Sequence, residues 1–317
     1  MNMHAPAPAH IAQEREDEAL GELLAYLKDS GYRFTTITPA THERVLKRPG
    51  TRPATLRDVF GWSRPFHDGD LNSEVVRLLR EAGGLIVEGG QFRSAYRVST
   101  LGRDLFVHSA FPTEEEKSIF FGPDTYRFAR LIGEWLPGLG PLQHIVDMGA
   151  GSGAGGIAAA RLRPNARLTL VDTNPAALRI AKVNARAAGV DAEVLQASEV
   201  PNGGDLLLAN PPYMIDRSGR TYRDGGALFG GEIALDWAKQ ALRALHPSGA
   251  MLLYTGAAIL KGAMPLEQEL RAACRARGAT LEIEELDPDV FGEELDEPAY
   301  AQVERIALVG ALIKIPG

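Results

Sequence analysis

Two stretches of the sequence hold residues whose types and spacing suit binding and group transfer. The first is HIVDMGAGSGAGGIAAAR, residues 144–161, where an apolar strand runs into closely spaced glycines and then into an alanine-rich helix. Glycines at such a place let the chain turn sharply and bring backbone N–H groups against a ligand at the helix N-terminus. The candidate binding residues of this glycine loop are Asp147, Gly149, Gly151 and Gly153.

The glycine loop by itself is also compatible with a nicotinamide dinucleotide. Gly151, Gly153 and Gly156 satisfy a GxGxxG spacing, and Asp172 ends the next strand, where a ribose-binding carboxylate belongs. Asp147 argues against a dinucleotide because an acid so near a pyrophosphate would repel it. The same acid would attract the ammonium and sulfonium of S-adenosylmethionine. The alternative is that Asp147 only caps the glycine turn.

The second stretch is DLLLANPPYMID, which places Asn210, Pro211, Pro212 and Tyr213 at the end of an apolar strand. Two consecutive prolines stop the strand and stiffen the loop, which fixes where the Asn210 amide and the Pro211 carbonyl point. Both groups can accept an N–H hydrogen bond from a planar amino group, whose lone pair then turns toward an electrophile while the tyrosine ring stacks on its plane. An ordinary Pro-Pro turn is the alternative, and the glycine loop and carboxylate upstream disfavour it.

Together these motifs make residues 112–317 resemble the class I S-adenosylmethionine-dependent methyltransferases. They look most like the branch with an (N/D)PP(Y/F) motif, which methylates amino groups of adenine and guanine and the amide of protein glutamine. The layout is similar to the release-factor glutamine methyltransferases and the small-domain ribosomal RNA guanine methyltransferases. The late segment DPDVFGEELDEPAYAQVERIALVG also looks like that of a bacterial methyltransferase group with an extra N-terminal domain.

The resemblance implies S-adenosyl-L-methionine as the cofactor and assigns residues to its parts. Asp147 and the three loop glycines would contact the methionine part, Asp172 the ribose hydroxyls and Thr173 the adenine. Ala197 and Ser198 fall where the family often has an acid near the adenine amino group, so the serine departs from the pattern.

On the acceptor side, the resemblance places residues 210–213 around the nitrogen that receives the methyl group, with Asn210 bordering the cofactor as well. Residues 121–125 correspond to a segment that closes over the cofactor, but they lack the charged pattern of the glutamine methyltransferases. The expected reaction is in-line displacement at the sulfonium methyl by a neutral nitrogen, which needs no catalytic triad. His144 and His246 are therefore expected to pack or to face solvent.

The surrounding pattern predicts the elements that position these residues. After residue 110, strands alternate with helices of about 10–15 residues, which indicates a doubly wound, Rossmann-like α/β sheet, mostly parallel with an antiparallel late strand. Earlier helical patterns precede a hairpin at Gly89-Gly90, which suggests a winged-helix-like α+β domain. We expect a disordered tail over residues 1–12, this N-terminal domain over 13–110 and the methyltransferase domain over 111–317.

Two local expectations concern the methyltransferase domain. Asp124 is available as the N-cap of a helix over residues 125–136. The glycine-rich segment that follows the NPPY motif, residues 217–231, forms either a mobile lid over the acceptor or a tight connection into the next helix.

Composition excludes several classes of protein. A single cysteine, Cys274, excludes an internal disulfide and a cysteine-rich zinc module, and it favours a reducing cytoplasm. The sequence has no apolar run of about 18 residues and no signal-peptide pattern at its start. An acidic run at residues 293–297 has no histidine or cysteine nearby, so no metal site is expected.

The charge is distributed unevenly. Residues 1–110 are neutral, and the rest of the chain carries the whole net charge of −7. Within the neutral part, residues 33–64 hold a basic group made of Arg33, Arg44, Lys47, Arg48, Arg52, Arg57 and Arg64. This stretch is either a module that faces a polyanion or an ordinary solvated surface.

The main functional hypothesis is an N-methyltransferase acting on a macromolecule, either a ribosomal RNA base or a protein glutamine. Its N-terminal domain would present the substrate, and Arg44, Lys47, Arg48 and Arg52 would contact RNA phosphates. The alternatives are a small-molecule methyltransferase whose N-terminal helices dimerise, a cofactor-binding scaffold without turnover, and a nicotinamide dehydrogenase. Nothing in the sequence points to DNA or a membrane as partner, and the oligomeric state stays open.

Overall fold

The computed structural model describes residues 9–50, 52–113, 118–215 and 224–317, and the chain divides into two compact units. Unit 1 comprises Met1–Thr113 with the short pieces Phe120–Pro123 and Lys182–Gly189. Unit 2 comprises the remaining residues, most of them in Asp124–Ala181 and Val190–Gly317. The expected boundary near residue 110 lies close to the first break, whereas the two short pieces that join unit 1 were not expected.

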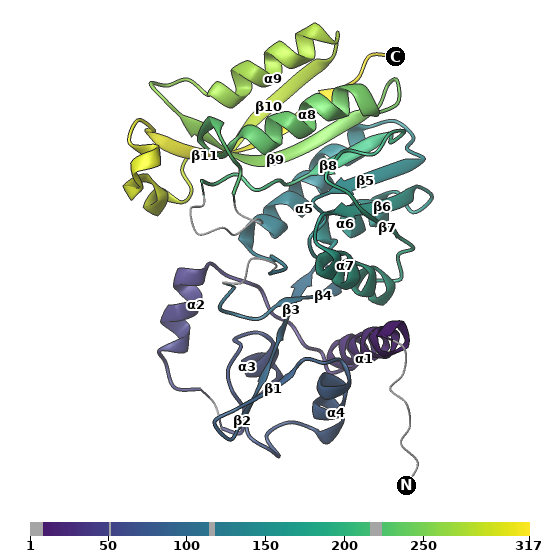
Figure 1. The fold of residues 1–317 in the computed structure, drawn as a ribbon, viewed down its shortest axis with the longest axis vertical. Helices are drawn as coiled ribbons and strands as arrows, with labels where there is room; N and C mark the ends of the chain where they lie inside the picture. The colour runs from purple at the N-terminus through teal and green to yellow at the C-terminus, as the bar shows by residue number, and fades with distance from the viewer. Residues whose placement is uncertain (1–8, 51, 114–117, 216–223) are drawn as a thin grey trace. The chain divides into compact units, whose positions relative to one another are not determined.

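Unit 2 is built on a seven-stranded sheet with the order β10-β11-β9-β8-β5-β6-β7 (Figure 1). Its strands are β5 (His144–Met148), β6 (Arg167–Asp172), β7 (Glu193–Gln196), β8 (Leu206–Ala209), β9 (Ala250–Ile259), β10 (Thr280–Asp287) and β11 (Arg305–Lys314). Strands β5 to β9 pair in parallel, and β11 runs antiparallel to both of its neighbours. The predicted doubly wound sheet with an antiparallel late strand is therefore confirmed.

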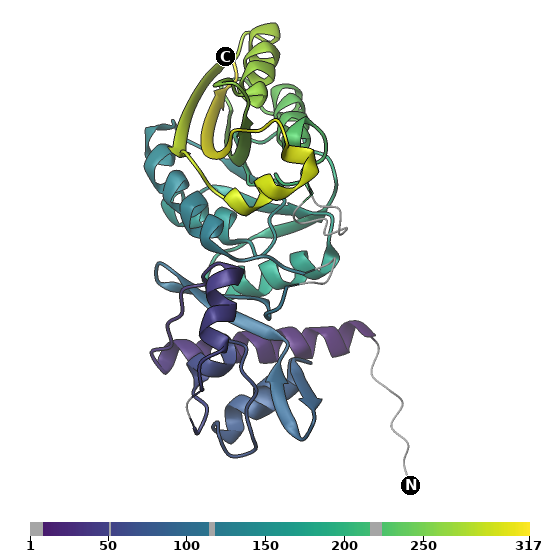
Figure 2. The same ribbon diagram turned by 90° about the vertical axis from the view of Figure 1, so that its left-hand side faces the viewer.

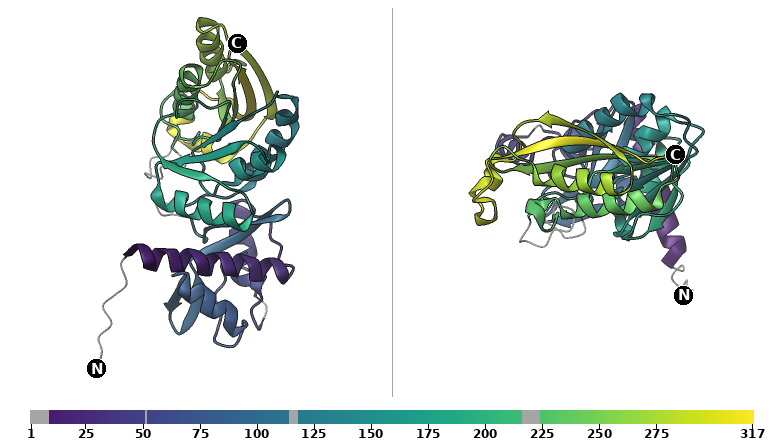
Figure 3. Two further views of the ribbon diagram at one scale, coloured as in Figure 1. Left: turned by 90° about the vertical axis from the view of Figure 1, so that its right-hand side faces the viewer. Right: turned by 90° about the horizontal axis from the view of Figure 1, so that it is seen from above.

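Helices cover both faces of this sheet (Figure 3). The helices α8 (Glu232–Ala244) and α9 (Pro265–Ala276) pack on one face, in a core that includes Val146. On the other face, α5 (Pro123–Trp135), α6 (Ala154–Leu162) and α7 (Pro175–Ala187) contribute to a core that includes Ile145. Successive residues of a strand point to opposite faces, and β5 accordingly carries apolar side chains toward both, with Ile145 in one core and Val146 in the other.

Two short 3-10 helices, η3 (Gly292–Asp296) and η4 (Pro298–Tyr300), lie between β10 and β11, in the yellow segment of Figure 2. The acidic run falls on η3 and the residue after it; Glu293, Asp296 and Glu297 are exposed, and Glu294 is half-buried. Tyr300 is buried instead, and its hydroxyl accepts a 2.8 Å hydrogen bond from the backbone N–H of Ile215. Among the residues that the structure describes, no group of three His, Cys, Asp or Glu side chains is placed to hold a metal ion.

Unit 1 combines four helices with two antiparallel hairpins. The elements are α1 (Ala9–Asp29), α2 (Pro39–Leu46), α3 (Leu56–Phe60), α4 (Ser73–Glu81), β1 (Leu85–Glu88), β2 (Gln91–Ser94), β3 (Tyr96–Leu101) and β4 (Asp104–Ser109). The first hairpin turns at Gly89 and Gly90, both with positive φ, as a tight two-residue turn requires. No helix in the described parts of the chain is long and apolar enough to span a membrane.

Three features of unit 1 differ from the expectation. Residues 9–12, expected to be disordered, belong to α1, because Ala, Gln and Glu favour helix here and the leucine stripe of the helix is buried. The helix α2 was not predicted, although Thr38 caps it and Pro39 begins it. The run around Gly89 is not one long hairpin: Ser94 bonds both backbone groups of Tyr96 and ends β2, so Tyr96 starts a second hairpin.

Candidate functional site

The candidate site lies at the carboxyl edge of the parallel strands. Met148 of β5 lies opposite Ala209 of β8 and opposite Val171 of β6. The glycine loop begins directly after β5, and the NPPY turn begins directly after β8, so the two leave from adjacent strand ends. This is the edge at which open α/β sheets bind ligands. The structure thus brings together the two motifs that the sequence singled out.

The glycine loop depends on backbone conformations that only glycine adopts without strain. Gly149, Gly151 and Gly153 have φ values of +70°, +53° and +78°, and α6 begins directly after them. A Cβ atom on Gly149 would lie 2.8 Å from the ring of Trp237, a residue of α8 that belongs to neither sequence motif. The loop therefore adopts this shape without strain only with glycine at these positions.

Asp147 lies beneath this loop and is 3% exposed. Its Oδ2 accepts a 2.7 Å hydrogen bond from the N–H of Gly156, in the first turn of α6. Burial raises the pKa of Asp147 to about 7; the Gly156 bond opposes this shift, and the nearby charge of Asp172 adds to it. The observed contact is the one expected if Asp147 caps the turn, and its contact with a cofactor stays a prediction.

Asp172 ties the glycine loop to the end of β6. Its Oδ2 accepts a 2.9 Å hydrogen bond from the N–H of Gly151, and its Oδ1 accepts one of 2.9 Å from the N–H of Asn174. A carboxylate oxygen has two acceptor positions, so both oxygens can accept a second bond from a hydroxyl. The carboxylate is thus fixed in orientation and can still bind a diol.

The residues expected beside the adenine lie at the neighbouring strand ends. Thr173 follows β6 and is exposed, and Ser198 lies just after β7 and is exposed as well. The backbone N–H of Ala197 donates to the carbonyl of Asp172 at 3.2 Å, which holds the two strand ends together. These positions fit one side of a shared site, and their role toward a ligand stays a prediction.

Asn210 begins the acceptor turn and is half-buried. Among the described residues, no hydrogen bond to its side-chain amide is found. Pro211 is buried and Pro212 is half-buried, which restricts the turn further.

Residues 224–231 pack tightly on this turn. The N–H of Gly225 donates to the carbonyl of Met214 at 2.6 Å, and a Cβ atom on Gly230 would lie 2.2 Å from the carbonyl oxygen of Tyr213. Of the two alternatives, a mobile lid or a tight connection into the next helix, residues 224–231 therefore form the tight connection. The other half, residues 216–223, lies outside the described residues, so the lid hypothesis is not tested there.

Tyr213 is held by a buried polar cluster that the sequence did not predict. Its hydroxyl donates to Asp124 Oδ2 at 2.6 Å, and the hydroxyl of Tyr254 donates to Asp124 Oδ1 at 2.9 Å. Arg127 donates to Asp124 Oδ1 at 3.1 Å. The expectation that Asp124 is an N-cap is wrong: α5 begins at Pro123, so Asp124 lies within its first turn and its side chain bonds the two tyrosines.

The cluster keeps both phenols protonated. Burial raises the pKa of Tyr213 well above its ordinary value, and the charge of Asp124 raises it further. The pKa of Tyr254 is raised for the same two reasons. Neither tyrosine is therefore suited to act as a base, in keeping with a reaction that needs none.

Gly256 of β9 makes room for the ring of Tyr213, because a Cβ atom there would lie 2.4 Å from Tyr213 Cδ2. Gly256, Tyr254 and Trp237 were all missed in the sequence. Each looks like an ordinary core residue in a buried strand or helix, and only the sheet order reveals what it contacts.

The two histidines lie at the opposite end of the parallel strands. His144 is the first residue of β5, and its Nε2 lies 2.9 Å from the hydroxyl of Thr169. His246 Nδ1 lies 3.0 Å from Asp205 Oδ1, and Asp205 Oδ2 accepts from the N–H of Gln143. Neither histidine lies at the strand ends that carry the glycine loop and the NPPY turn: His144 packs in the interior, and His246 faces solvent.

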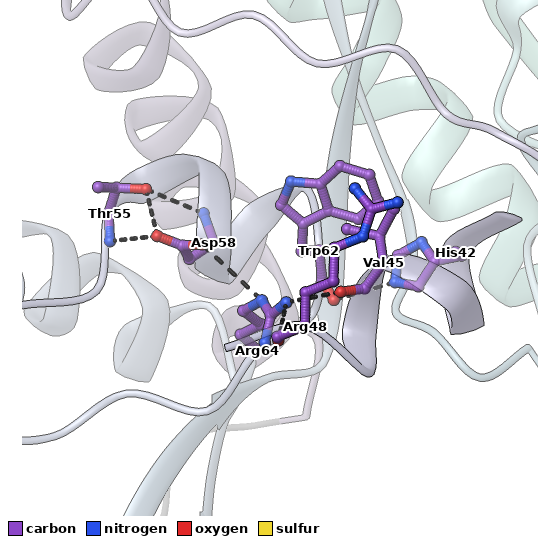
Figure 4. A network of polar contacts seen from close by, with 7 residues as sticks. All are labelled: His42, Val45, Arg48, Thr55, Asp58, Trp62 and Arg64. Carbon is purple, nitrogen blue, oxygen red and sulfur yellow. Dashed lines mark hydrogen bonds and ion pairs between the residues drawn. The ribbon is translucent and has the colours of Figure 1, made fainter. Parts of the chain in front are cut away.

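Unit 1 presents a basic surface at α2 and the residues after it. Arg44, Lys47 and Arg48 are exposed. Arg64 is not part of this surface, because it donates two 2.9 Å hydrogen bonds to the carbonyls of Val45 and Arg48 and closes the end of the helix (Figure 4). The exposed cations are thus displayed by a fixed helix end.

The same network anchors this helix end to α3. Arg64 Nε lies 3.9 Å from Asp58 Oδ1, and Asp58 forms a capping box with Thr55 at the start of α3. His42 of α2 lies 3.0 Å from the carbonyl of Trp62 through its Nε2 (Figure 4). Burial, reinforced by the charge of Arg97, lowers the pKa of His42 to about 4, so it is a neutral packing residue.

Beside this network lies a hollow of about 280 Å³, lined by Arg33, Phe34, Thr35, Arg57, Thr100 and Gly102. Arg57 Nη1 donates to the carbonyl of Arg33 at 2.6 Å, and its guanidinium lies 5.0 Å from the centre of the Phe34 ring. The lining contains two guanidinium groups and no carboxylate. Its chemistry suits an oxyanion.

Comparison with known proteins agrees with this geometry. The family model "Methyltransferase small domain" matches residues 129–273. The ribosomal RNA large subunit methyltransferase G of Vibrio vulnificus is 36% identical over 104 residues, which are 30% of this chain and 27% of that protein. The release factor glutamine methyltransferase of Deinococcus radiodurans is 31% identical over 163 residues, which are 47% of this chain and 55% of that protein.

The chain therefore spans at most about half the length of these two relatives. Among solved structures, Trm5b of Pyrococcus abyssi is similar at 12% identity with a TM-score of 0.49, covering 78% of this chain and 68% of that one. The family match includes β5, the glycine loop, β8 and the NPPY turn. Residues 129–273 thus belong to the methyltransferase small domain family, within the class of S-adenosylmethionine-dependent methyltransferases.

Proposed function

We propose that the chain transfers a methyl group from S-adenosylmethionine to a planar amino or amide nitrogen of a macromolecule. The observation that carries the proposal is the pairing of β5 with β8, which starts the glycine loop and the Asn210 turn from adjacent strand ends. The names of the relatives, a ribosomal RNA methyltransferase and a release factor glutamine methyltransferase, support a macromolecular acceptor.

The residues at the strand ends fit the cofactor. The glycine loop brings the N-terminus of α6 to the strand end, where its positive end would face the methionine carboxylate, and the carboxyl group of Asp147 lies beneath the loop. Asp172 keeps an acceptor position on each oxygen for the ribose hydroxyls. When bound, the cofactor supplies a methyl group on a sulfonium, which is already a good leaving group.

The chain's own residues would align and hold the acceptor. The Asn210 amide oxygen and the Pro211 carbonyl would each accept an N–H bond from the acceptor nitrogen, which points its lone pair at the methyl group. Alignment at near-attack distance can contribute roughly 7–11 kcal/mol. The same two oxygens would stabilise the positive charge that develops on nitrogen. With both tyrosines protonated, the proton leaves to solvent after transfer.

We favour RNA over protein as the acceptor class. Six cations between residues 33 and 57 of unit 1 are exposed, against Glu43 as the exposed acid of that range: Arg33, Arg44, Lys47, Arg48, Arg52 and Arg57. A polyanion gains from such a surface, and its phosphates match the oxyanion chemistry of the hollow beside Arg57. A target base would have to be unstacked to reach the half-buried Asn210.

The experiment is to incubate the full chain with methyl-labelled S-adenosylmethionine and an unfractionated lysate. RNA, protein and small-molecule fractions are then separated and counted, with Asn210→Ala as the inactive control. We expect label in the RNA fraction that depends on Asn210. Label in the protein fraction would contradict RNA as the acceptor, label in the small-molecule fraction would favour the alternative function, and no label in any fraction would contradict methyl transfer itself.

A further inference from the structure

A buried carboxylate lies directly behind the NPPY turn. Asp124 is 5% exposed and accepts hydrogen bonds on both oxygens, from Tyr213 at 2.6 Å and from Tyr254 at 2.9 Å. The two tyrosine donors come from the loop after β8 and from β9, while Asp124 itself belongs to α5, as does its third donor, Arg127. One carboxylate thus joins three elements that are far apart in the sequence.

The ring of Tyr213 is fixed on its other sides as well. Gly256 of β9 lies so close that a Cβ atom would come within 2.4 Å of the ring, and Phe291 lies 6.0 Å away between ring centres. The ring is 9% exposed. These contacts restrict the position of the ring, and the hydrogen bond from its hydroxyl to Asp124 fixes its orientation.

We infer that Asp124 is a positioning residue for methyl transfer: by holding the hydroxyl of Tyr213 it sets the Asn210–Tyr213 turn, and with it the two oxygens that orient the acceptor nitrogen. This inference rests on the proposed function for its effect on turnover. The hydroxyl of Tyr213 is then committed to the protein, so Tyr213 contributes its ring and not its O–H to the acceptor.

The turn is short and stiff, so a contact that fixes Tyr213 at one end also restricts Asn210 at the other. Only two prolines separate Tyr213 from Asn210, and proline fixes φ. On the far side, the N–H of Ile215 is held by Tyr300 at 2.8 Å. Release of the Tyr213 hydroxyl removes the hydrogen bond that fixes the position of its ring and leaves the packing of the ring and the backbone contacts of the turn.

Two variants test the inference, with one matched control. Asp124→Asn keeps the size of the side chain but replaces one acceptor oxygen by an NH₂ group. Tyr213→Phe keeps the ring and removes the hydroxyl. Glu134→Gln makes the same acid-to-amide change on α5 at an exposed position, where it affects only the pair with Arg130.

The first measurement is hydrogen–deuterium exchange, which requires no acceptor. We expect faster exchange in a peptide covering residues 206–215 for Asp124→Asn and Tyr213→Phe, with β5 and α6 unchanged, and no effect of Glu134→Gln. Unchanged exchange at 206–215 in both variants would overturn the inference. A rise spread evenly over unit 2 would also overturn it, because it would show a general loss of stability.

The second measurement is turnover with the labelled lysate fraction. We expect either variant to lower kcat about tenfold or more, while the Kd for S-adenosylmethionine stays within about twofold, and the double variant to lose little beyond either single one. Wild-type kcat in both variants would overturn the inference. If the wild type labels nothing, the proposed function fails, and the exchange experiment still decides whether Asp124 holds the turn.

Discussion

At the scale of single residues, substitutions on the acceptor side of the site are expected to lower turnover, and substitutions on the cofactor side to lower cofactor affinity. Asn210→Ala removes an acceptor oxygen that no described residue uses, so it should leave the cofactor affinity nearly intact and lower turnover by about 100-fold or more. Asp172→Ala should weaken cofactor binding first. Titration calorimetry with S-adenosylmethionine beside a turnover assay measures both, and equal losses of affinity and turnover in Asn210→Ala would contradict its assigned role.

Asp147 gives a prediction about pH. Its pKa is raised to about 7 in the folded protein, so folding favours its protonated form; this contribution to stability is present at low pH and is lost as the pH rises through about 7. Asp147→Asn lacks it but keeps an oxygen for the Gly156 N–H. Between pH 5 and pH 8 the wild type should therefore lose about 3 kcal/mol of unfolding free energy relative to this variant, by denaturant unfolding at each pH.

The same variant distinguishes the two roles of Asp147. If the carboxylate also faces the cationic part of the cofactor, binding favours its ionised form, and the affinity rises with pH up to about 7 and then levels off. That rise should disappear in Asp147→Asn. A cofactor affinity with the same pH dependence in wild type and variant would leave Asp147 as a cap of the turn alone.

At the scale of elements, β9 sets the position of the Tyr213 ring, and with it the acceptor turn, through the contact of Gly256 with that ring. Gly256→Ala places a Cβ atom 2.4 Å from the ring of Tyr213, so the ring must move and carry the turn with it. A displacement of about 1 Å at a reacting centre can cost about 100-fold, and we expect a loss of turnover of that order with cofactor affinity preserved.

Gly133→Ala is the matched control for this prediction. Gly133 lies within α5, and an added Cβ atom there has no atom within 4 Å. It should leave turnover unchanged and stabilise the helix slightly, since alanine is the better helix former. Equal turnover in the two variants would show that the contact between Gly256 and Tyr213 does not matter for transfer.

At the scale of the whole molecule, the contribution of each unit to RNA binding can be tested by removing exposed cations from one unit at a time in the full chain. Deleting residues 1–113 is a poor experiment, because the side chain of Asn184, in α7, exchanges two hydrogen bonds with the backbone of Val107 and would lose both. Four substitutions to Gln are better, at exposed cations of unit 1: Arg44, Lys47, Arg48 and Arg52.

We expect these substitutions to weaken binding to single-stranded ribosomal RNA fragments and to reduce the salt dependence of log K by roughly 3, the value for four lost phosphate contacts. Salt titrations of fluorescence anisotropy measure the slope. A control removes four exposed cations from α8 and α9 of unit 2, by changing Lys239, Arg243, Arg271 and Arg275 to Gln. An equal effect of both sets would show that net charge and not the basic surface binds RNA.

The sequence alone predicted the doubly wound sheet, its antiparallel late strand and the two motifs, because each of these depends on local properties. Strand and helix periods, glycine before a helix and consecutive prolines after a strand are all readable within about 10–20 residues. The placement of the glycine loop and Asn210 at one edge of the sheet also followed, since parallel strands end at the same edge. That they leave from adjacent strands depends on the pairing of β5 with β8.

Only the tertiary structure showed what holds the acceptor turn. Asp124 resembled a helix cap in sequence, while Tyr254 and Gly256 resembled ordinary residues of a buried strand. Their contacts join α5, β9 and the loop after β8, and such contacts depend on the order of strands in the sheet and on the packing of side chains. A linear pattern carries neither, because residues about a hundred positions apart meet only after the chain has folded.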